Sequence, residues 1–179
     1  MRIISGQWRG RPLVAPKGGA TRPTADRTRE ALFSMLTSRL GSFEDLRVLD
    51  LFAGSGALGL EALSRGAAHA TFVEFDGAAV KALRANAEKL GITPDIRVQS
   101  ALALGPCPAP YDLIMMDAPY GTGAASVALD KLGRLGWFSA GAWISIETDR
   151  SETIDVAGFE TDVVRDHGKA RITLLRPCA

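Results

Sequence analysis

Three glycines and one glutamate stand where a nucleoside-type ligand could bind. Gly54, Gly56 and Gly59 match the pattern G-x-G-x-x-G directly after an apolar run, and Glu74 lies twenty residues beyond Gly54, at the end of the next apolar run. Glycines at a strand-to-helix turn let a ligand approach the backbone closely, and an acid at the second strand end can accept both ribose hydroxyls. The spacing therefore predicts a nucleoside-type cofactor. The alternative is a tight turn with close helix packing.

The carboxylate of Asp50, just ahead of these glycines, narrows the choice of cofactor. A helix N-terminus suits the diphosphate of a dinucleotide, whereas a carboxylate beside it suits a cation. S-adenosylmethionine carries an ammonium and a sulfonium and no phosphate, so it is the cofactor we expect. The glycines also motivate a nicotinamide oxidoreductase, which would need a proton donor beside its substrate. The two histidines, His69 and His167, follow no carboxyl end of a core strand and read as ordinary surface or turn residues.

A second candidate motif, Asp117-Ala118-Pro119-Tyr120, follows another apolar run. In an open α/β sheet, ligands bind at the carboxyl ends of the strands, so this motif and Asp50 should lie at one edge. An exocyclic base amine is a poor nucleophile, and a carboxylate with a backbone carbonyl can accept its two N–H groups and orient the nitrogen. Pro119 stiffens the loop, and Tyr120 can stack on a base taken out of its helix. The alternative is a turn in which Asp117 caps the backbone.

The apolar pattern along the chain predicts the elements that must position these motifs. We expect strands over 46–52, 70–75, 96–99, 111–117, 142–148, 159–165 and 170–176. We expect helices over 25–40, 57–65, 78–90 and 124–135, with Thr24 as the N-cap of the first helix. Residues 3–14 should form a small hairpin. Alternating strands and helices indicate an α/β fold with a mostly parallel sheet covered on both faces. The last two strands are too close for a parallel crossover, so they should form an antiparallel hairpin.

Composition and charge bound the class of protein. The 179 residues fit one domain, and 46% hydrophobic with 23% charged residues is typical of a globular chain. We expect no membrane span and no secretory signal. Two cysteines, Cys107 and Cys178, lack C-x-x-C spacing, which argues against a zinc site and fits a reducing cytoplasm. Residues 1–30 hold seven basic and two acidic side chains, a net of +5, which suggests a polyanionic partner or a solvated basic face.

Several blocks of the sequence resemble known methyltransferases. The segment D-L-F-A-G-S-G at 50–56 is similar to motif I of class I S-adenosylmethionine-dependent methyltransferases, and D-A-P-Y at 117–120 is similar to the [DN]-P-P-[YFW] motif of enzymes that methylate exocyclic amines of bases. With R-I-I-S-G-Q-W-R-G at 2–10 and R-P-T-A-D-R-T-R-E-A-L-F at 22–33, the chain resembles, almost end to end, the bacterial 16S rRNA guanine-N2 methyltransferases. It departs from the family pattern at Ala118, where proline is usual, and at Ala101, where a polar residue usually contacts the adenine amine.

The resemblance implies a fold, a cofactor, a partner and a set of site residues. The fold is a seven-stranded class I methyltransferase domain over 25–179 with a basic N-terminal extension over 1–24. The cofactor is S-adenosylmethionine, and the partner is 16S rRNA of the small ribosomal subunit, with no metal and no membrane, in a monomeric cytoplasmic enzyme. By position, the residues that would contact the cofactor are Thr24, Asp50, Phe52, Ala53, Gly54, Ser55, Gly56, Glu74, Phe75, Ser100 and Ala101. The target guanine would contact Asp117, Pro119 and Tyr120. The rRNA phosphates would contact Arg2, Arg9, Arg11, Lys17 and Arg22.

Two alternatives stay open on the residues alone. The chemistry of the motif at 117–120 serves several exocyclic amines, so another nucleic-acid amino-methyltransferase, such as an N6-adenine enzyme, fits the same pattern. The departures at Ala118 and Ala101 also allow a non-catalytic RNA-binding assembly factor on the same fold. Without the resemblance, the sequence does not distinguish guanine from adenine.

Overall fold

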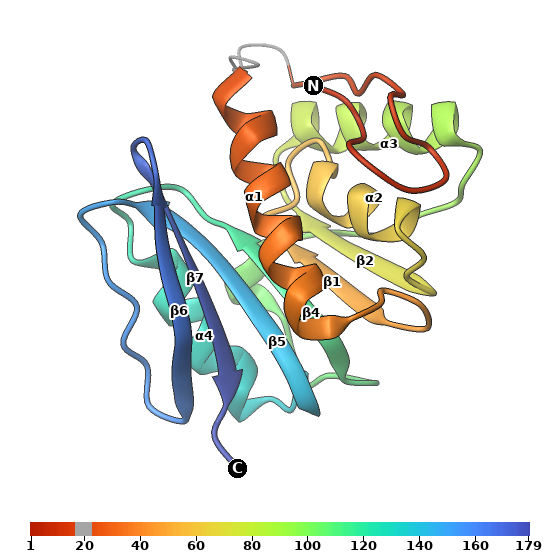
Figure 1. Ribbon diagram of the computed structural model, residues 1–179. Coiled ribbons are helices and arrows are strands. Elements are labelled where there is room, and N and C mark those ends of the chain that lie inside the picture. Colours follow the sequence, from red (N-terminus) through yellow and green to blue (C-terminus); the bar gives the residue numbers. More distant parts are fainter. Residues whose placement is uncertain (17–22) are drawn as a thin grey trace.

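The chain folds around a seven-stranded sheet with the strand order β3-β2-β1-β4-β5-β7-β6 (Figure 1). The structure, a computed structural model, describes residues 1–16 and 23–179. In chain order the elements are α1 (Pro23–Leu40), β1 (Arg47–Leu51), α2 (Ala57–Ser64), β2 (His69–Glu74), α3 (Gly77–Leu90), β3 (Asp95–Val98), the 3-10 helix η1 (Ala101–Ala103), β4 (Tyr111–Asp117), α4 (Ala124–Arg134), β5 (Phe138–Asp149), β6 (Phe159–His167) and β7 (Ala170–Pro177).

The pairing of the strands confirms the predicted α/β fold. Strands β1 to β5 run parallel to one another, and β7 runs antiparallel to both β5 and β6. Most predicted elements begin and end within two residues of the observed ones. Strand β5 is the exception, because it begins at Phe138, four residues before the predicted start. The short helix η1 was not predicted.

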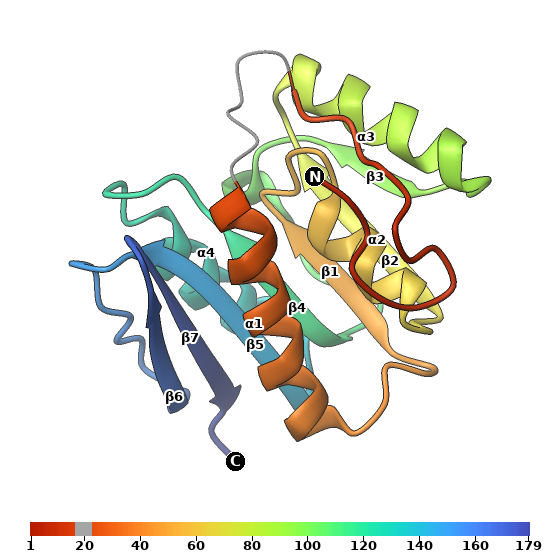
Figure 2. The same cartoon turned by 45° about the horizontal axis from the view of Figure 1, so that its top comes forward.

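Side chains of β4 alternate between two cores, which explains its unbroken apolar run. Leu113 and Met115 pack on the side of α1, α2 and α3, whereas Ile114 and Met116 pack on the side of α4. Figures 1 and 2 show the three N-terminal helices over one face of the sheet and α4 over the other. Because both faces are covered, the strand is apolar until its carboxyl end, where Asp117 stands.

The N-terminal segment, residues 1–16, differs from the predicted hairpin. Within it, a single isolated bridge between Arg2 and Pro12 takes the place of two regular strands. Ile3 and Leu13 are buried and join the core formed with α1, α2 and α3. The segment lies against the helices, as Figure 2 shows. Its two halves are also joined to each other, because the N–H of Ile3 donates a 3.0 Å hydrogen bond to the carbonyl oxygen of Arg11 and the N–H of Leu13 a 2.9 Å bond to that of Met1.

Buried polar side chains hold this segment on α2 and α3. Glu61 of α2, which is 0% exposed, accepts hydrogen bonds from the backbone N–H of Ile4 at 2.8 Å and of Ser5 at 3.0 Å. Asn86 of α3 accepts a 2.7 Å hydrogen bond from the N–H of Val14 and donates a 2.9 Å bond to its carbonyl oxygen. These side chains satisfy backbone groups of a segment that has little regular structure.

Helix α1 begins at Pro23, two residues earlier than predicted. Thr24 thus lies inside the helix and is not its N-cap, which corrects the prediction. Proline is favoured in the first helical turn because its missing N–H would have no partner there and its φ is already helical. At 18 residues α1 is the longest helix, and no helix in the described part of the chain is long and apolar enough to cross a membrane.

Candidate active site

The carboxyl ends of β1 and β4 meet at one edge of the sheet, as predicted, because these strands are adjacent and parallel. The carboxyl end of β5 lies beside that of β4. Asp117 and Glu147 are direct partners in the register of β4 and β5. A cavity of about 180 Å³ lies at this edge. It is lined by Met1, Ala25, Arg29, Asp50, Phe52, Ala53, Gly54, Ser55, Ala57, Leu58, Asp117 and Glu147.

The three glycines of the loop serve different purposes. A Cβ on Gly56 would lie 2.1 Å from a methyl carbon of Leu83, and a Cβ on Gly59 would lie 2.4 Å from the ring of Phe72, so helix packing requires both. Gly54 has a φ of +56°, and a Cβ there would meet no atom of the described residues within 4 Å. Because Gly54 also lines the cavity, the loop leaves space for a ligand at this glycine alone. Close packing thus accounts for two of the three glycines.

Asp50 lies beneath the loop, at the end of β1. Its Oδ2 accepts a 2.8 Å hydrogen bond from the backbone N–H of Gly59, which fixes the loop to the strand. Burial raises the pKa of Asp50 well above its usual range, the bond from Gly59 opposes this rise, and the charges of Asp117 and Glu74 add to it. A cationic ligand in the cavity would favour the ionised form of this carboxyl.

Glu74 is held in place by three backbone N–H groups. Its Oε2 accepts a 2.8 Å hydrogen bond from Gly54, and its Oε1 accepts 2.8 Å bonds from Phe75 and Asp76. A carboxylate oxygen has two lone pairs, so Oε2 can accept one more bond, such as that of a ribose hydroxyl. Phe75 is 68% exposed, and its ring can cover a flat ligand. The glycine loop and the acid twenty residues later are therefore joined directly.

Asp117 combines access to the cavity with a raised pKa. The residue is exposed to solvent, and it lines the cavity, where neighbouring protein groups displace part of its surrounding water. This desolvation, followed by the negative charge of Glu147, raises the pKa of Asp117 to about 7. A carboxyl group with this pKa can exchange a proton near neutral pH, which suits a group that must hold an amine before transfer and take up its proton afterwards.

Tyr120 is tied to β5 by its hydroxyl group. The hydroxyl donates a 2.5 Å hydrogen bond to Oε1 of Glu147. Partial burial, followed by this bond, raises the pKa of Tyr120 above its usual value, so the phenol stays protonated. The carbonyl oxygen of Pro119 accepts a 2.7 Å bond from the hydroxyl of Thr122. The loop after β4 is thus ordered by side chains as well as by its proline.

Two charged residues that line the cavity, Arg29 and Glu147, were not singled out as cofactor-binding residues, although Arg29 belongs to the block at 22–33 that carries the family resemblance. Glu147 could have been found by the reasoning used for Asp50 and Asp117, because it stands near the carboxyl end of an apolar strand. Arg29 is only 5% exposed although it belongs to a charged stretch of α1. Burial lowers the pKa of Arg29, against the opposing charge of Asp26.

Some predicted residues do not line the cavity. The hydroxyl of Ser100 accepts a 3.2 Å hydrogen bond from the N–H of Leu102 and caps η1, and Ala101 is buried in the core on the side of α4. Gly56 faces Leu83. The side chain of Thr24 lies outside the described residues.

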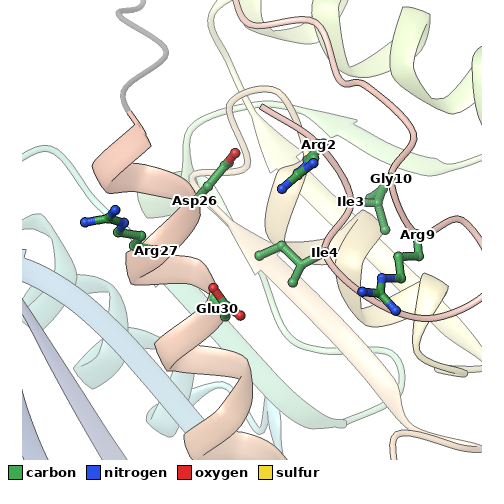
Figure 3. Close-up of a pocket in the computed structure, with 8 residues that line it drawn as sticks. All are labelled: Arg2, Ile3, Ile4, Arg9, Gly10, Asp26, Arg27 and Glu30. Atoms are coloured by element: carbon green, nitrogen blue, oxygen red, sulfur yellow. The ribbon is translucent and has the colours of Figure 1, made fainter.

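Of the predicted basic residues, the three that the structure describes, Arg2, Arg9 and Arg11, do not all line one cavity. Arg2 and Arg9 line a second cavity, of about 430 Å³, between the N-terminal segment and α1, together with Arg27, Asp26 and Glu30 (Figure 3). Figure 3 shows side chains from both elements around this space. Arg11 instead donates a 3.2 Å hydrogen bond to the carbonyl oxygen of Lys89 at the end of α3. Lys17 and Arg22 lie outside the described residues.

The charges around the first cavity favour a cationic ligand over a diphosphate. Three of its lining residues are acidic, namely Asp50, Asp117 and Glu147. A cationic ligand would favour the ionised forms of Asp50 and Asp117, whereas a diphosphate would disfavour them. Together with the space at Gly54 and the acceptor at Glu74, this arrangement fits S-adenosylmethionine and argues against a nicotinamide dinucleotide. Within residues 1–16 and 23–179, no group of three or more His, Cys, Asp or Glu side chains is placed to hold a metal ion.

Comparison with known proteins gives a consistent family. The family described as conserved hypothetical protein 95 matches residues 1–176. Ribosomal RNA small subunit methyltransferase D of Escherichia coli K12 is 40% identical over 151 residues, which cover 83% of this chain and 75% of the relative. The protein of the same name from Haemophilus influenzae is 35% identical over 160 residues, covering 86% of this chain and 81% of the relative. The solved structure of the Escherichia coli protein yhhF superimposes with a TM-score of 0.85 at 36% identity, covering 100% of this chain and 98% of that one.

Proposed function

This chain belongs to the family described as conserved hypothetical protein 95, and we propose that it is an enzyme that transfers a methyl group from S-adenosylmethionine to the exocyclic N2 amine of a guanine in 16S rRNA of the small ribosomal subunit. The relatives named ribosomal RNA small subunit methyltransferase D support the reaction and its substrate class. The observation that carries the proposal is the position of Asp117, beside a glycine loop that is bonded to Glu74.

Residues of the glycine loop and its neighbours would hold the cofactor. When bound, S-adenosylmethionine supplies an electrophilic methyl group on its sulfonium. Glu74 Oε2 has an acceptor site left for a ribose hydroxyl, and Gly54 leaves room for the ligand against the backbone. The carboxylates of Asp50 and Asp117 attract the cationic groups. Phe75 would cover the adenine, and the contact expected at Ser100 and Ala101 would come from backbone groups.

Asp117 would act on the target amine. In its ionised form the carboxylate accepts an N–H of the guanine N2 amine and directs the nitrogen toward the methyl group. With the amine held by Asp117, the methyl group would pass from the sulfonium to this nitrogen, and the sulfur would keep the electron pair of the carbon–sulfur bond. The nitrogen then loses one proton, which Asp117 can accept because its pKa is about 7. Pro119 and Tyr120 would position the base, with the ring of Tyr120 stacked on it.

The basic residues near α1 would bind rRNA phosphates. Arg2, Arg9 and Arg27 line the second cavity, with the side chain of Arg27 on the side of α1 that faces away from the N-terminal segment (Figure 3), and each phosphate that they neutralise would release counterions. We also assign Arg11, Lys17 and Arg22 to this role, as the resemblance implies. The enzyme would act as a monomer in the cytoplasm, where ribosomal subunits are found.

The test is methyl transfer from labelled S-adenosylmethionine to small ribosomal subunits that lack the modification. The product is digested and its methylated nucleoside identified. We expect N2-methylguanosine, with at least a hundredfold loss of rate in Asp117→Asn, about the effect of removing one preorganised group. Asp130→Asn, an exposed carboxylate on α4, is the matched control and should keep the rate.

Other products would change the proposal in defined ways. N6-methyladenosine would retain the reaction class and refute the guanine assignment. An unlabelled particle, with S-adenosylmethionine still bound, would refute catalysis on this substrate and favour a binding factor.

A further inference from the structure

The cavity of the candidate active site is lined by three acidic side chains and by one basic side chain. Asp50, Asp117 and Glu147 suit the ammonium and sulfonium groups of the proposed cofactor. The cofactor also carries an α-carboxylate, which these residues would repel. Among the described residues, Arg29 is the only arginine, lysine or histidine that lines this cavity. The cavity thus offers a single cationic side chain for the single anionic group of the cofactor.

The guanidinium of Arg29 is buried and only partly satisfied. Its Nη2 donates a 3.0 Å hydrogen bond to Oδ1 of Asp26 and a second bond to the carbonyl oxygen of Arg2. Its Nε is buried and has no hydrogen-bond partner among the described residues. A buried donor without a partner is costly, and such groups usually pair with a ligand or water. Burial also lowers the pKa of Arg29, so an anion in the cavity would favour its charged form.

We propose that Arg29 binds the α-carboxylate of the amino-acid portion of S-adenosylmethionine. Both N–H groups of Nη2 already donate to Asp26 and Arg2, so the donors left for a carboxylate are those on Nε and Nη1, and charge-assisted hydrogen bonds of this kind are strong when shielded from water. The inference rests on the proposed function, because it takes S-adenosylmethionine as the ligand. It assigns the two charged groups of the amino-acid portion to different elements: the ammonium to the carboxyl ends of β1, β4 and β5, and the carboxylate to α1.

A purely structural role is the competing explanation for Arg29. Through Arg2 and Asp26 it joins the N-terminal segment to α1, so its loss could disturb the cavity without any contact to the cofactor. A useful test must therefore separate the carboxylate from the rest of the ligand. S-adenosylhomocysteine and its decarboxylated form, which keeps the adenosine, the thioether and the amine, differ in that group alone.

We would measure the binding of both compounds by calorimetry to the full chain and to three variants. The wild type should bind S-adenosylhomocysteine about 10- to 100-fold more tightly than the decarboxylated form. Arg29→Met should abolish this preference by weakening the first compound alone, and Arg29→Lys should retain part of it. Arg84→Met is the matched control, because Arg84 is an exposed arginine on α3 that lines neither cavity. It should leave the preference unchanged.

The outcomes separate this inference from the proposed function. A preference that survives in both Arg29 variants would overturn the assignment while leaving the cofactor in place. Equal weakening of both compounds would show a structural role and would also overturn it. If Arg29→Met does not fold, the preference measured for Arg29→Lys tests the assignment, since lysine keeps the charge but lacks the planar guanidinium group. A wild type that binds neither compound would refute the cofactor itself, and this inference with it.

Discussion

The hydroxyl of Tyr120 donates a 2.5 Å hydrogen bond to Oε1 of Glu147, and Glu147 is the register partner of Asp117. The loop after β4 is thereby attached to the neighbouring strand through a side chain that also lines the cavity. Because Tyr120 is partly exposed, its ring keeps a face for a ligand while its hydroxyl is fixed. The bond sets the position of the ring relative to Asp117.

Tyr120 gives the first prediction. If its ring stacks on the target base, Tyr120→Ala should lower kcat/KM for the ribosomal substrate by about 5- to 100-fold, the range of one base-to-ring stacking contact. Tyr120→Phe keeps the ring and loses only the bond to Glu147, so its loss should be several-fold at most. Initial rates of methyl transfer for the two variants provide the measurement. Equal losses of kcat/KM in the two variants would mean that the hydroxyl of Tyr120, and not its ring, contributes to the reaction.

The glycine loop could be predicted from the sequence because its signals are local. Asp50, Gly54 and Glu74 stand at the ends of apolar runs, and parallel strands place such ends at one edge. Glu147 stands in the same kind of position but was overlooked, because no motif surrounds it. Its pairing with Asp117 depends on the register of β4 and β5, which short motifs do not encode.

Arg29 was not singled out within its sequence block for a different reason. It lies in the charged stretch D-R-T-R-E, in which composition alone does not separate it from the exposed Arg27. Its spacing does, since Arg29, Leu32, Phe33 and Leu36 follow the i, i+3, i+4, i+7 pattern of one helix face. All four residues are buried. The charged Arg29 on this otherwise apolar helix face was the signal that could have singled it out.

Two glycines of the loop give a matched pair of substitutions. Gly54 and Gly56 both have positive φ, so alanine at either position should cost about 1 kcal/mol of backbone strain. At Gly56 the new Cβ would also collide with Leu83, adding about 1–3 kcal/mol. Gly54→Ala should therefore reduce S-adenosylhomocysteine binding by about tenfold or more with a small loss of stability, whereas Gly56→Ala should mainly reduce the free energy of unfolding.

Urea denaturation and calorimetry on the same samples would separate these effects. The reasoning about Gly54 fails if its alanine variant binds the ligand as tightly as the wild type does.

Glu61 provides a prediction for the N-terminal segment. Glu61→Ala removes the acceptor of two backbone N–H groups, those of Ile4 and Ser5. Leaving these donors without a partner should lower the free energy of unfolding by about 2–4 kcal/mol. Residues 1–16 should also become accessible to proteases before the rest of the domain unfolds. Glu88→Ala, at a more exposed carboxylate of α3, is the control. Unchanged proteolysis in Glu61→Ala would mean that the apolar contacts of Ile3 and Leu13 suffice.

The pKa of Asp117 predicts how the reaction depends on pH. The carboxylate accepts an N–H only when ionised, so kcat/KM should rise with pH through an inflection near the pKa of about 7. Stability should change in the opposite direction, because a raised pKa means that the folded state binds more protons than the unfolded state between pH 3.8 and about 7. Glu147→Gln removes the charge that raises this pKa and keeps an oxygen that can accept from Tyr120. The inflection should move to lower pH but stay above 3.8, because burial is the larger cause. The pH profiles of kcat/KM for the wild type and Glu147→Gln test this prediction. An inflection that does not move would show that the charge of Glu147 does not raise the pKa of Asp117.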